Sequence, residues 1–169
     1  FTVSKLLWMR NHEPQLFEKI SHMLLAKDYV RFRLTGELAT DPSDASATLL
    51  FDIVNSRWSG ELCSMLGLDL TILPPIVEST GIVARVTSVA ATATGLTAGV
   101  PVVGGGADNA CAAVGAGVVS SGDVLFSVGT SGTVVAPISE PSTDPAMRIH
   151  SMRHAVPDTW YLMGVVLSA

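Results

Sequence analysis

An acidic residue follows a run of glycines near the middle of the chain. Residues 102–117 read VVGGGADNACAAVGAG, with Asp108 and Asn109 just after the glycines. The valines predict a buried strand and the small residues after Asp108 predict a helix, which would place Asp108 at the carboxyl edge of a sheet. Ligands of open α/β folds bind at that edge. The pattern indicates either a carboxylate that faces a cleft or an N-cap that satisfies free helix amides.

A second glycine motif, SVGTSG at residues 127–132, has the composition of a loop that wraps a phosphate. A strand leads into Gly129, and Thr130 and Ser131 supply two hydroxyls before Gly132. Glycine permits a positive φ, and successive backbone amides form an anion-binding concavity. No lysine follows, so this is not a Walker loop. A tight hairpin turn built from small residues is the other interpretation.

Other groups that could carry chemistry give weaker signals. His150 and His154 stand four apart, but IHSMRHAV lacks the glutamate of a zinc-binding HExxH motif, so ordinary histidines are favoured. Cys63 and Cys111 lie far apart without CxxC spacing, which argues against a disulfide framework and against a zinc site. We therefore expect no metal site within the chain and a reducing, cytoplasmic location.

The composition is that of a globular protein and excludes two classes of partner. The chain has 169 residues, 48% of them hydrophobic, and a net charge of −5 with scattered basic residues, so no nucleic-acid partner is expected. The most apolar window, residues 99–119, contains Asp108, Asn109 and many glycines, so no membrane segment is expected. The chain begins without methionine and ends in an apolar run, which predicts a piece of a longer protein.

The predicted elements alternate between helices and strands, which favours an α/β fold. Pro14 restarts the first helical pattern, Gly36 ends the second, and Ser59 is the N-cap of the third. Residues 22–26 are compatible with a short buried strand or with helix. Helices are expected at 4–20, 22–37, 59–66 and 87–96, and strands at 49–53, 81–86, 99–105, 124–128 and 133–138. The last two strands would form a hairpin.

Four motifs in sequence order resemble the FGGY family of carbohydrate kinases. They are KLLWMRNH at 5–12, DPSDASATLLFD at 41–52 with RWSGELC behind it, GGGADNACAAVGAG at 104–117, and SVGTSG at 127–132. The resemblance runs along nearly the whole chain. It implies part of a two-domain α/β ATPase fold of the actin, hexokinase and Hsp70 (ribonuclease H-like) type. Residues 1–118 would end the first, sugar-binding domain, and residues 119–169 would start the second, nucleotide-binding domain.

The resemblance also implies roles for the two glycine motifs, with ATP and Mg²⁺ as cofactors. Phosphoryl transfer needs mostly positioning and charge stabilisation, with one carboxylate to take the proton of the attacking hydroxyl. Asp108 would be that general base, with Asn109 in contact with the sugar and glycines that let the sugar approach the backbone. The second loop would approach the ATP phosphates through Gly129, Thr130, Ser131 and Gly132.

Within the family the later motifs, including HSMRHAVPDTWYLMGVVLSA at 150–169, look most like members that phosphorylate D-xylulose to D-xylulose 5-phosphate. Kinases for glycerol, gluconate, ribulose or fuculose, and a non-catalytic actin-like nucleotide-binding domain, are the alternatives. The family's DxGT phosphate loop and its adenosine site are absent from the chain, so the isolated chain is expected to be inactive. The sequence does not fix the oligomeric state and is compatible with a homodimer.

Overall fold

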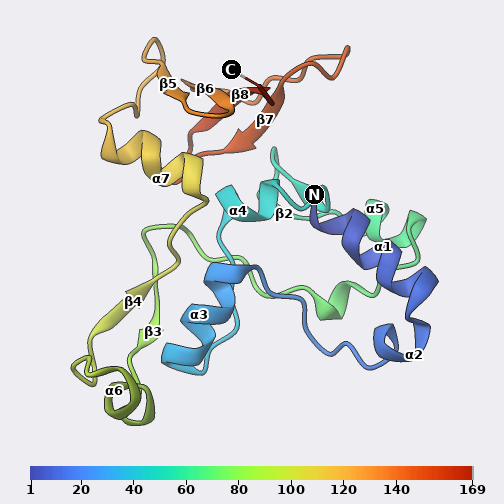
Figure 1. The fold of residues 1–169 in the computed structure, drawn as a ribbon, viewed down its shortest axis with the longest axis vertical. Coiled ribbons are helices and arrows are strands. Elements are labelled where there is room, and N and C mark those ends of the chain that lie inside the picture. The colour runs from blue at the N-terminus through green and yellow to red at the C-terminus, as the bar shows by residue number, and fades with distance from the viewer. Residues whose placement is uncertain (169) are drawn as a thin grey trace.

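The computed structural model describes residues 1–168, and the first part of the chain is mainly helical (Figure 1). Its helices are α1 (Thr2–His12), α2 (Pro14–Phe17), α3 (Ala26–Thr35), α4 (Pro42–Ser46) and α5 (Gly60–Met65), followed by the 3-10 helix η1 (Leu70–Ile72). Residues 21–25 form neither strand nor helix, although Met23 is buried among them. The helical interpretation of the first 36 residues is therefore confirmed, with an irregular connection between α2 and α3.

The ends of these helices lie where local chemistry predicts them. Pro14 occupies the first turn of α2, where its missing N–H is not needed. Gly36 takes the left-handed conformation after α3, with φ of 82°. Ser59 caps α5 by accepting a hydrogen bond from the amide of Leu62 at 3.2 Å. Asp41 caps α4, so the residues expected to form only a turn there begin a short helix.

Strand β1 (Phe51–Asp52) is shorter than the predicted strand at 49–53 and pairs with β2 (Arg57–Trp58), which the sequence analysis did not predict. Leu49 has a positive φ of 64°, so the extended backbone begins only after it. These two short strands lie beside a hydrophobic core under α1 and α5, formed by Leu6, Met23, Leu50, Cys63, Leu68, Ile72 and Leu73.

The strand, helix and strand that follow do not form a parallel unit. Strands β3 (Ile82–Arg85) and β4 (Pro101–Val103) pair antiparallel in a two-stranded ribbon, with α6 (Ser88–Thr94) at its end. The inference that strand–helix–strand order favours an α/β sheet is therefore wrong for this segment. The sequence predicted a buried strand at residues 99–105. Val103 in β4 is 46% exposed, so that part of the prediction is wrong. Short apolar strands do not encode the direction of their partner, which the path of the chain decides.

The last part of the chain forms a four-stranded antiparallel sheet of order β5-β6-β8-β7. Its strands are β5 (Leu125–Val128), β6 (Gly132–Ile138), β7 (His150–Arg153) and β8 (Trp160–Val166). The predicted hairpin is confirmed, because Val128 lies opposite Gly132 across a three-residue turn at residues 129–131. Strands β7 and β8 were not predicted.

Helix α7 (Asp108–Gly115) covers this sheet. Ala110 and Ala113 pack against Val135, Met152 and Tyr161, and small residues on the helix bring the two backbones close together. Figure 1 shows the sheet and α7 at one end of the molecule, and β3, β4 and α6 at the other. Across residues 1–168, no helix is both long and apolar enough to cross a bilayer.

Candidate active site

Asp108 is the first residue of α7 and its side chain is exposed. Its Oδ1 atom accepts hydrogen bonds from the backbone amide of Asn109 at 2.7 Å and from the Asn109 side-chain amide at 3.1 Å. The N-cap of the helix is Ala107, so the interpretation of Asp108 as an N-cap is wrong. A carboxylate at the N-terminus of a helix lies where the helix dipole favours negative charge. Both bonds fall on Oδ1, and among residues 1–168 no hydrogen bond to Oδ2 is found.

The glycines before Asp108 let other segments of the chain pack closely against this loop. A Cβ atom on Gly104 would lie 2.6 Å from the carbonyl oxygen of Glu78, and one on Gly106 would lie 3.1 Å from Ala155 Cβ. Gly105 has a φ of 74°, which few side chains tolerate. The space beside Gly104 and Gly106 is thus filled by the chain itself, and the expectation that these glycines leave room for a sugar is wrong there.

The GTSG loop is the turn of the β5–β6 hairpin. Gly129, Thr130 and Ser131 are exposed, and the Gly129 amide donates to the carbonyl of Ser131 at 2.9 Å. Gly129 does not use the positive φ that glycine permits. Gly132 is buried at the start of β6. The hairpin interpretation is confirmed, and the exposed hydroxyls of Thr130 and Ser131 leave a phosphate-binding role for the same turn as a prediction.

The structure brings the first glycine motif beside the residue that follows the second. Thr133, the residue after the GTSG turn, donates from Oγ1 to Oδ1 of Asn109 at 3.5 Å. The contact places Asn109, at the start of α7, beside the start of β6, the strand that follows the GTSG turn.

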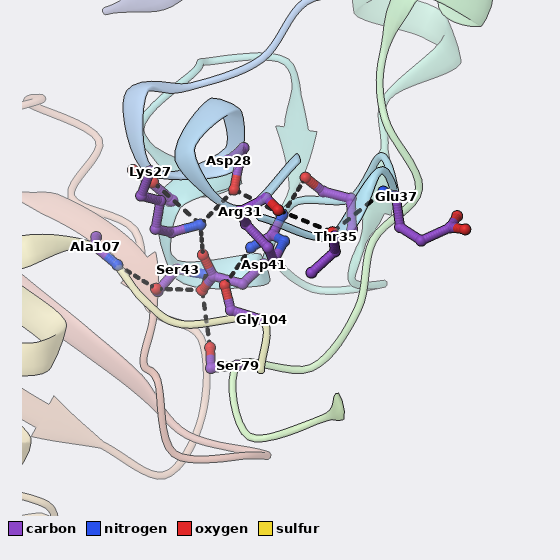
Figure 2. Close-up of polar contacts among 12 residues, drawn as sticks. Lys27, Asp28, Arg31, Thr35, Glu37, Asp41, Ser43, Ser79, Gly104 and Ala107 are labelled. Carbon is purple, nitrogen blue, oxygen red and sulfur yellow. Dashed lines mark hydrogen bonds and ion pairs between the residues drawn. The ribbon is translucent and has the colours of Figure 1, made fainter. Parts of the chain in front are cut away.

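A buried network of charges beside the glycine loop was missed by the sequence analysis (Figure 2). Lys27 Nζ lies 2.7 Å from both Asp28 Oδ1 and Asp41 Oδ1, and 3.4 Å from Asp44 Oδ2. Arg31 Nη2 lies 2.9 Å from Asp28 Oδ1. Asp28, Arg31 and Asp41 are each less than 5% exposed. Oppositely charged residues at this spacing on a helix usually form a solvated face, so the sequence carried only a weak signal.

Burial and charge together shift two pKa values in this network. Burial lowers the pKa of Lys27, but the Asp41 charge and the bonds to Asp28 outweigh it, so that pKa lies above its ordinary value. Burial raises the pKa of Asp44, although the nearby charge of Lys27 opposes the rise. Lys27 is thus a fixed positive charge that holds carboxylates in place and is unsuited to accept a proton.

The histidines and cysteines behave as ordinary side chains. His154 is buried and its Nδ1 accepts from the amide of Val156 at 3.0 Å, while His150 packs edge-on against Phe1. Cys63 and Cys111 are both free thiols. In the part of the chain that the structure describes, no three His, Cys, Asp or Glu side chains are grouped so as to hold a metal ion.

The chain matches a known protein family. A family model described as the FGGY family of carbohydrate kinases, N-terminal domain, matches residues 1–115. The chain belongs to the FGGY family. The family membership expected from the four sequence motifs is therefore confirmed.

Individual relatives extend the match beyond the family model. The chain is 46% identical over 169 residues to the xylulose kinase of Bacillus subtilis (strain 168), and 42% identical to that of Escherichia coli (strain K12). A crystal structure described as a xyloylose kinase from Brucella ovis superposes with a TM-score of 0.95 and 40% identity, over 100% of this chain and 35% of that one. The FGGY chain has the actin and hexokinase type of α/β fold in part, as predicted. It spans 34% and 35% of the length of the two curated relatives, and all of this chain is matched in each.

Proposed function

We propose that the full-length protein transfers the γ-phosphoryl group of ATP to D-xylulose, giving ADP and D-xylulose 5-phosphate. The observation that carries the proposal is the 46% identity to a xylulose kinase along the entire chain, which includes both glycine motifs. The structure supports it through the exposed carboxylate of Asp108, which lies on the helix that touches the strand after the GTSG turn. In this proposal the substrates are a small sugar and ATP, and the protein acts in the cytoplasm.

In the proposed reaction the sugar hydroxyl attacks the γ-phosphorus while its proton passes to Asp108. A new oxygen–phosphorus bond forms, the bond to the leaving ADP oxygen breaks, and the carboxylate holds the proton that the alcohol loses. Asn109 orients the sugar and keeps Asp108 Oδ1 occupied through its two amide contacts. The amides and hydroxyls of the loop Gly129, Thr130, Ser131 and Gly132 contact the ATP phosphates.

The magnesium ion that we propose to accompany ATP is not assigned to side chains of this segment. Among residues 1–168, no three His, Cys, Asp or Glu side chains are grouped so as to hold a metal ion. The phosphates and other parts of the full-length protein would supply the coordination. We also propose that residues 1–118 belong to the sugar-binding domain and residues 119–169 to the nucleotide-binding domain, with α7 leading from one to the other.

The test is ADP release by the full-length protein, with D-xylulose, glycerol, gluconate, L-ribulose and L-fuculose offered separately beside a sample without sugar. Turnover that depends on D-xylulose supports the proposal, and turnover with another sugar moves the assignment to a different kinase of the family. ATP hydrolysis that no sugar stimulates would favour a nucleotide-binding protein without a sugar acceptor.

The role of Asp108 is tested by Asp108→Asn in the same protein. Asparagine keeps the size of the side chain and removes the proton acceptor, so turnover should fall by about three orders of magnitude with ATP binding retained. Turnover near the wild-type value would contradict the assignment of Asp108 as the general base.

A further inference from the structure

The loop that carries Asp108 is held by side chains and carbonyls that lie far from it in the sequence. Arg31 donates from Nη1 to the carbonyl of Gly104. The Gly105 amide donates to the carbonyl of Ser79 at 2.9 Å. Immediately before α7, the Ala107 amide donates to Ser43 Oγ at 2.9 Å. The loop is therefore fixed at both of its ends by groups from the first part of the chain (Figure 2).

The orientation of the Ser43 hydroxyl is set by Asp41. Asp41 Oδ2 accepts from the Ser43 amide at 2.9 Å and from the Ser43 hydroxyl, and Ser79 Oγ donates to the same oxygen at 2.8 Å. A carboxylate can only accept, so the single hydroxyl proton of Ser43 points at Asp41. That leaves a lone pair of Ser43 Oγ for the amide of Ala107. Asp41 and Ser43 are both fully buried, so no water competes for these bonds.

The charge on Asp41 is in turn balanced by Lys27. Lys27 Nζ lies 2.7 Å from Asp41 Oδ1, the oxygen that does not contact Ser43. The contacts form a continuous path from the Lys27 ammonium group through Asp41 and Ser43 to the backbone of Ala107 (Figure 2). Charged partners make the hydrogen bonds of such a path stronger than bonds between neutral groups.

Ala107 is the position where this path can act on the proposed base. It is the N-cap of α7 and immediately precedes Asp108, and its own side chain has no oxygen with which to cap the helix. Its amide is held by Ser43 and its carbonyl accepts from Cys111 at 2.8 Å. A shift of Ala107 would therefore move the backbone from which the Asp108 carboxylate projects.

We propose that Ser43 is a positioning residue for Asp108, with Asp41 and Lys27 fixing the direction of its hydroxyl. This inference rests on the proposed function, in which Asp108 accepts a proton. Ser43 does not touch the reacting atoms in this proposal and acts only through the Ala107 amide. Misplacement of a catalytic group by about 1 Å lowers turnover by about 100-fold, so the loss of this anchor has a measurable kinetic consequence.

The experiment compares Ser43→Ala with Ser46→Ala in the full-length protein. Both serines are buried on α4, and Ser46 Oγ makes a similar pair of bonds, donating to the Pro42 carbonyl at 2.7 Å and accepting from the Arg153 amide at 3.0 Å. Ser46 anchors β7 and does not contact the glycine loop. The control therefore resembles Ser43 in burial and in the number of bonds that its hydroxyl makes, but it donates to a neutral carbonyl and holds a different element.

Three readouts distinguish positioning from general destabilisation. Ser43→Ala should lower kcat by about 10-fold to 100-fold, leave the KM for ATP unchanged and speed amide hydrogen exchange in residues 104–109. When Ser43→Ala is added to Asp108→Asn, the residual turnover should fall no further, because the carboxylate that Ser43 positions is already lost. Ser46→Ala should leave kcat close to the wild-type value when both are compared at the same folded fraction.

A second variant covers the case in which Ser43→Ala does not fold. Ala107→Pro removes the same amide donor from the other side, and the φ of Ala107, −58°, suits proline. It should reproduce the fall in kcat and the absence of a further effect beside Asp108→Asn.

Two results would overturn the inference. One is a kcat for Ser43→Ala equal to that of Ser46→Ala, and the other is an equal fall in turnover with and without Asp108. If the wild-type protein shows no sugar-dependent turnover, the proposed function and the positioning role fail together. Sugar-dependent turnover in the wild type with an unaffected Ser43→Ala variant removes only the positioning role.

Discussion

Thr133 Oγ1 lies 3.5 Å from Asn109 Oδ1, and this contact joins the first turn of α7 to the first residues of β6. Asn109 follows the proposed general base, and Thr133 follows the turn that we propose to meet the ATP phosphates. At 3.5 Å the hydrogen bond is long and contributes little energy. The contact matters because it shows that Asn109 and Thr133, which are 24 positions apart in the sequence, lie side by side.

The role of Asn109 can be separated from its contact with Thr133. Asn109→Ala should raise the KM for the sugar with a smaller effect on the KM for ATP, because the proposed sugar contact is lost. Thr133→Val removes the same inter-element bond and keeps the Asn109 amide, so its steady-state constants should stay close to those of the wild type. If the two variants behave alike, Asn109 acts through Thr133 and its role as a sugar contact is wrong.

Gly104→Ala should destabilise the full-length protein, because its new Cβ would stand 2.6 Å from the carbonyl oxygen of Glu78. Backbone must move to relieve such a clash, and overpacking of this kind costs about 1–3 kcal/mol. Gly115→Ala is the matched control, since nothing lies within 4 Å of the place that its new methyl group would take and it ends a helix. The midpoints of urea unfolding should fall for the first variant and hold or rise for the second. An unchanged midpoint for Gly104→Ala would contradict the packing argument.

Asp41→Asn should be among the most destabilising polar substitutions in the chain. The carboxylate is fully buried, pairs with Lys27 and accepts from Ser43 and Ser79. Lys27 keeps its contacts with Asp28 and Asp44, so the main loss is of hydrogen bonds to a charged acceptor, which contribute about 1.5–3 kcal/mol each. Asp69→Asn serves as the control, because Asp69 is an exposed N-cap of η1 and asparagine caps equally well. Denaturant unfolding of both variants measures the difference, and equal midpoints would show that the Lys27–Asp41 pair does not stabilise the fold.

His154 should make stability depend on pH on the acidic side. Burial holds the pKa of His154 below its ordinary value, and its Nδ1 already accepts from the Val156 amide, so protonation would break that bond. The stabilising contribution is therefore complete above the ordinary pKa and is lost as pH falls through the lowered one. His154→Asn offers an acceptor that does not titrate. Urea midpoints between about pH 5 and pH 8 should vary less for this variant than for the wild type, and parallel curves would exclude His154 as the titrating group.

Much of the fold followed from local chemistry. The positions of Pro14, Gly36 and Ser59 predicted the ends of three helices, because caps and breakers act through bonds within one or two turns. The β5–β6 hairpin was predicted for the same reason, since its turn chemistry lies in adjacent residues. Family membership also followed from sequence, because four motifs in a fixed order are far more specific than any one of them.

The direction of strand pairing could not be predicted in this way. Strands β3 and β4 read as parts of a layered sheet but pair antiparallel. Strands β7 and β8 were missed, although they supply Met152 and Tyr161 to the core beneath α7. Pairing depends on which segments meet after collapse, and a strand of three or four residues carries too few side chains to encode its partner.

The sequence by itself indicated the kind of chemistry that we propose, through an aspartate after glycines and a hydroxyl-rich turn after a strand, and it placed the chain in the FGGY family. The tertiary structure alone decided what holds that aspartate in place. Lys27 pairs with Asp41, Asp41 holds the Ser43 hydroxyl, and Ser43 contacts the backbone of Ala107, which lies 64 residues further along the chain. Such long-range bonds leave no periodic pattern in the sequence, because they are formed by burial of distant segments against one another and not by neighbours along the chain.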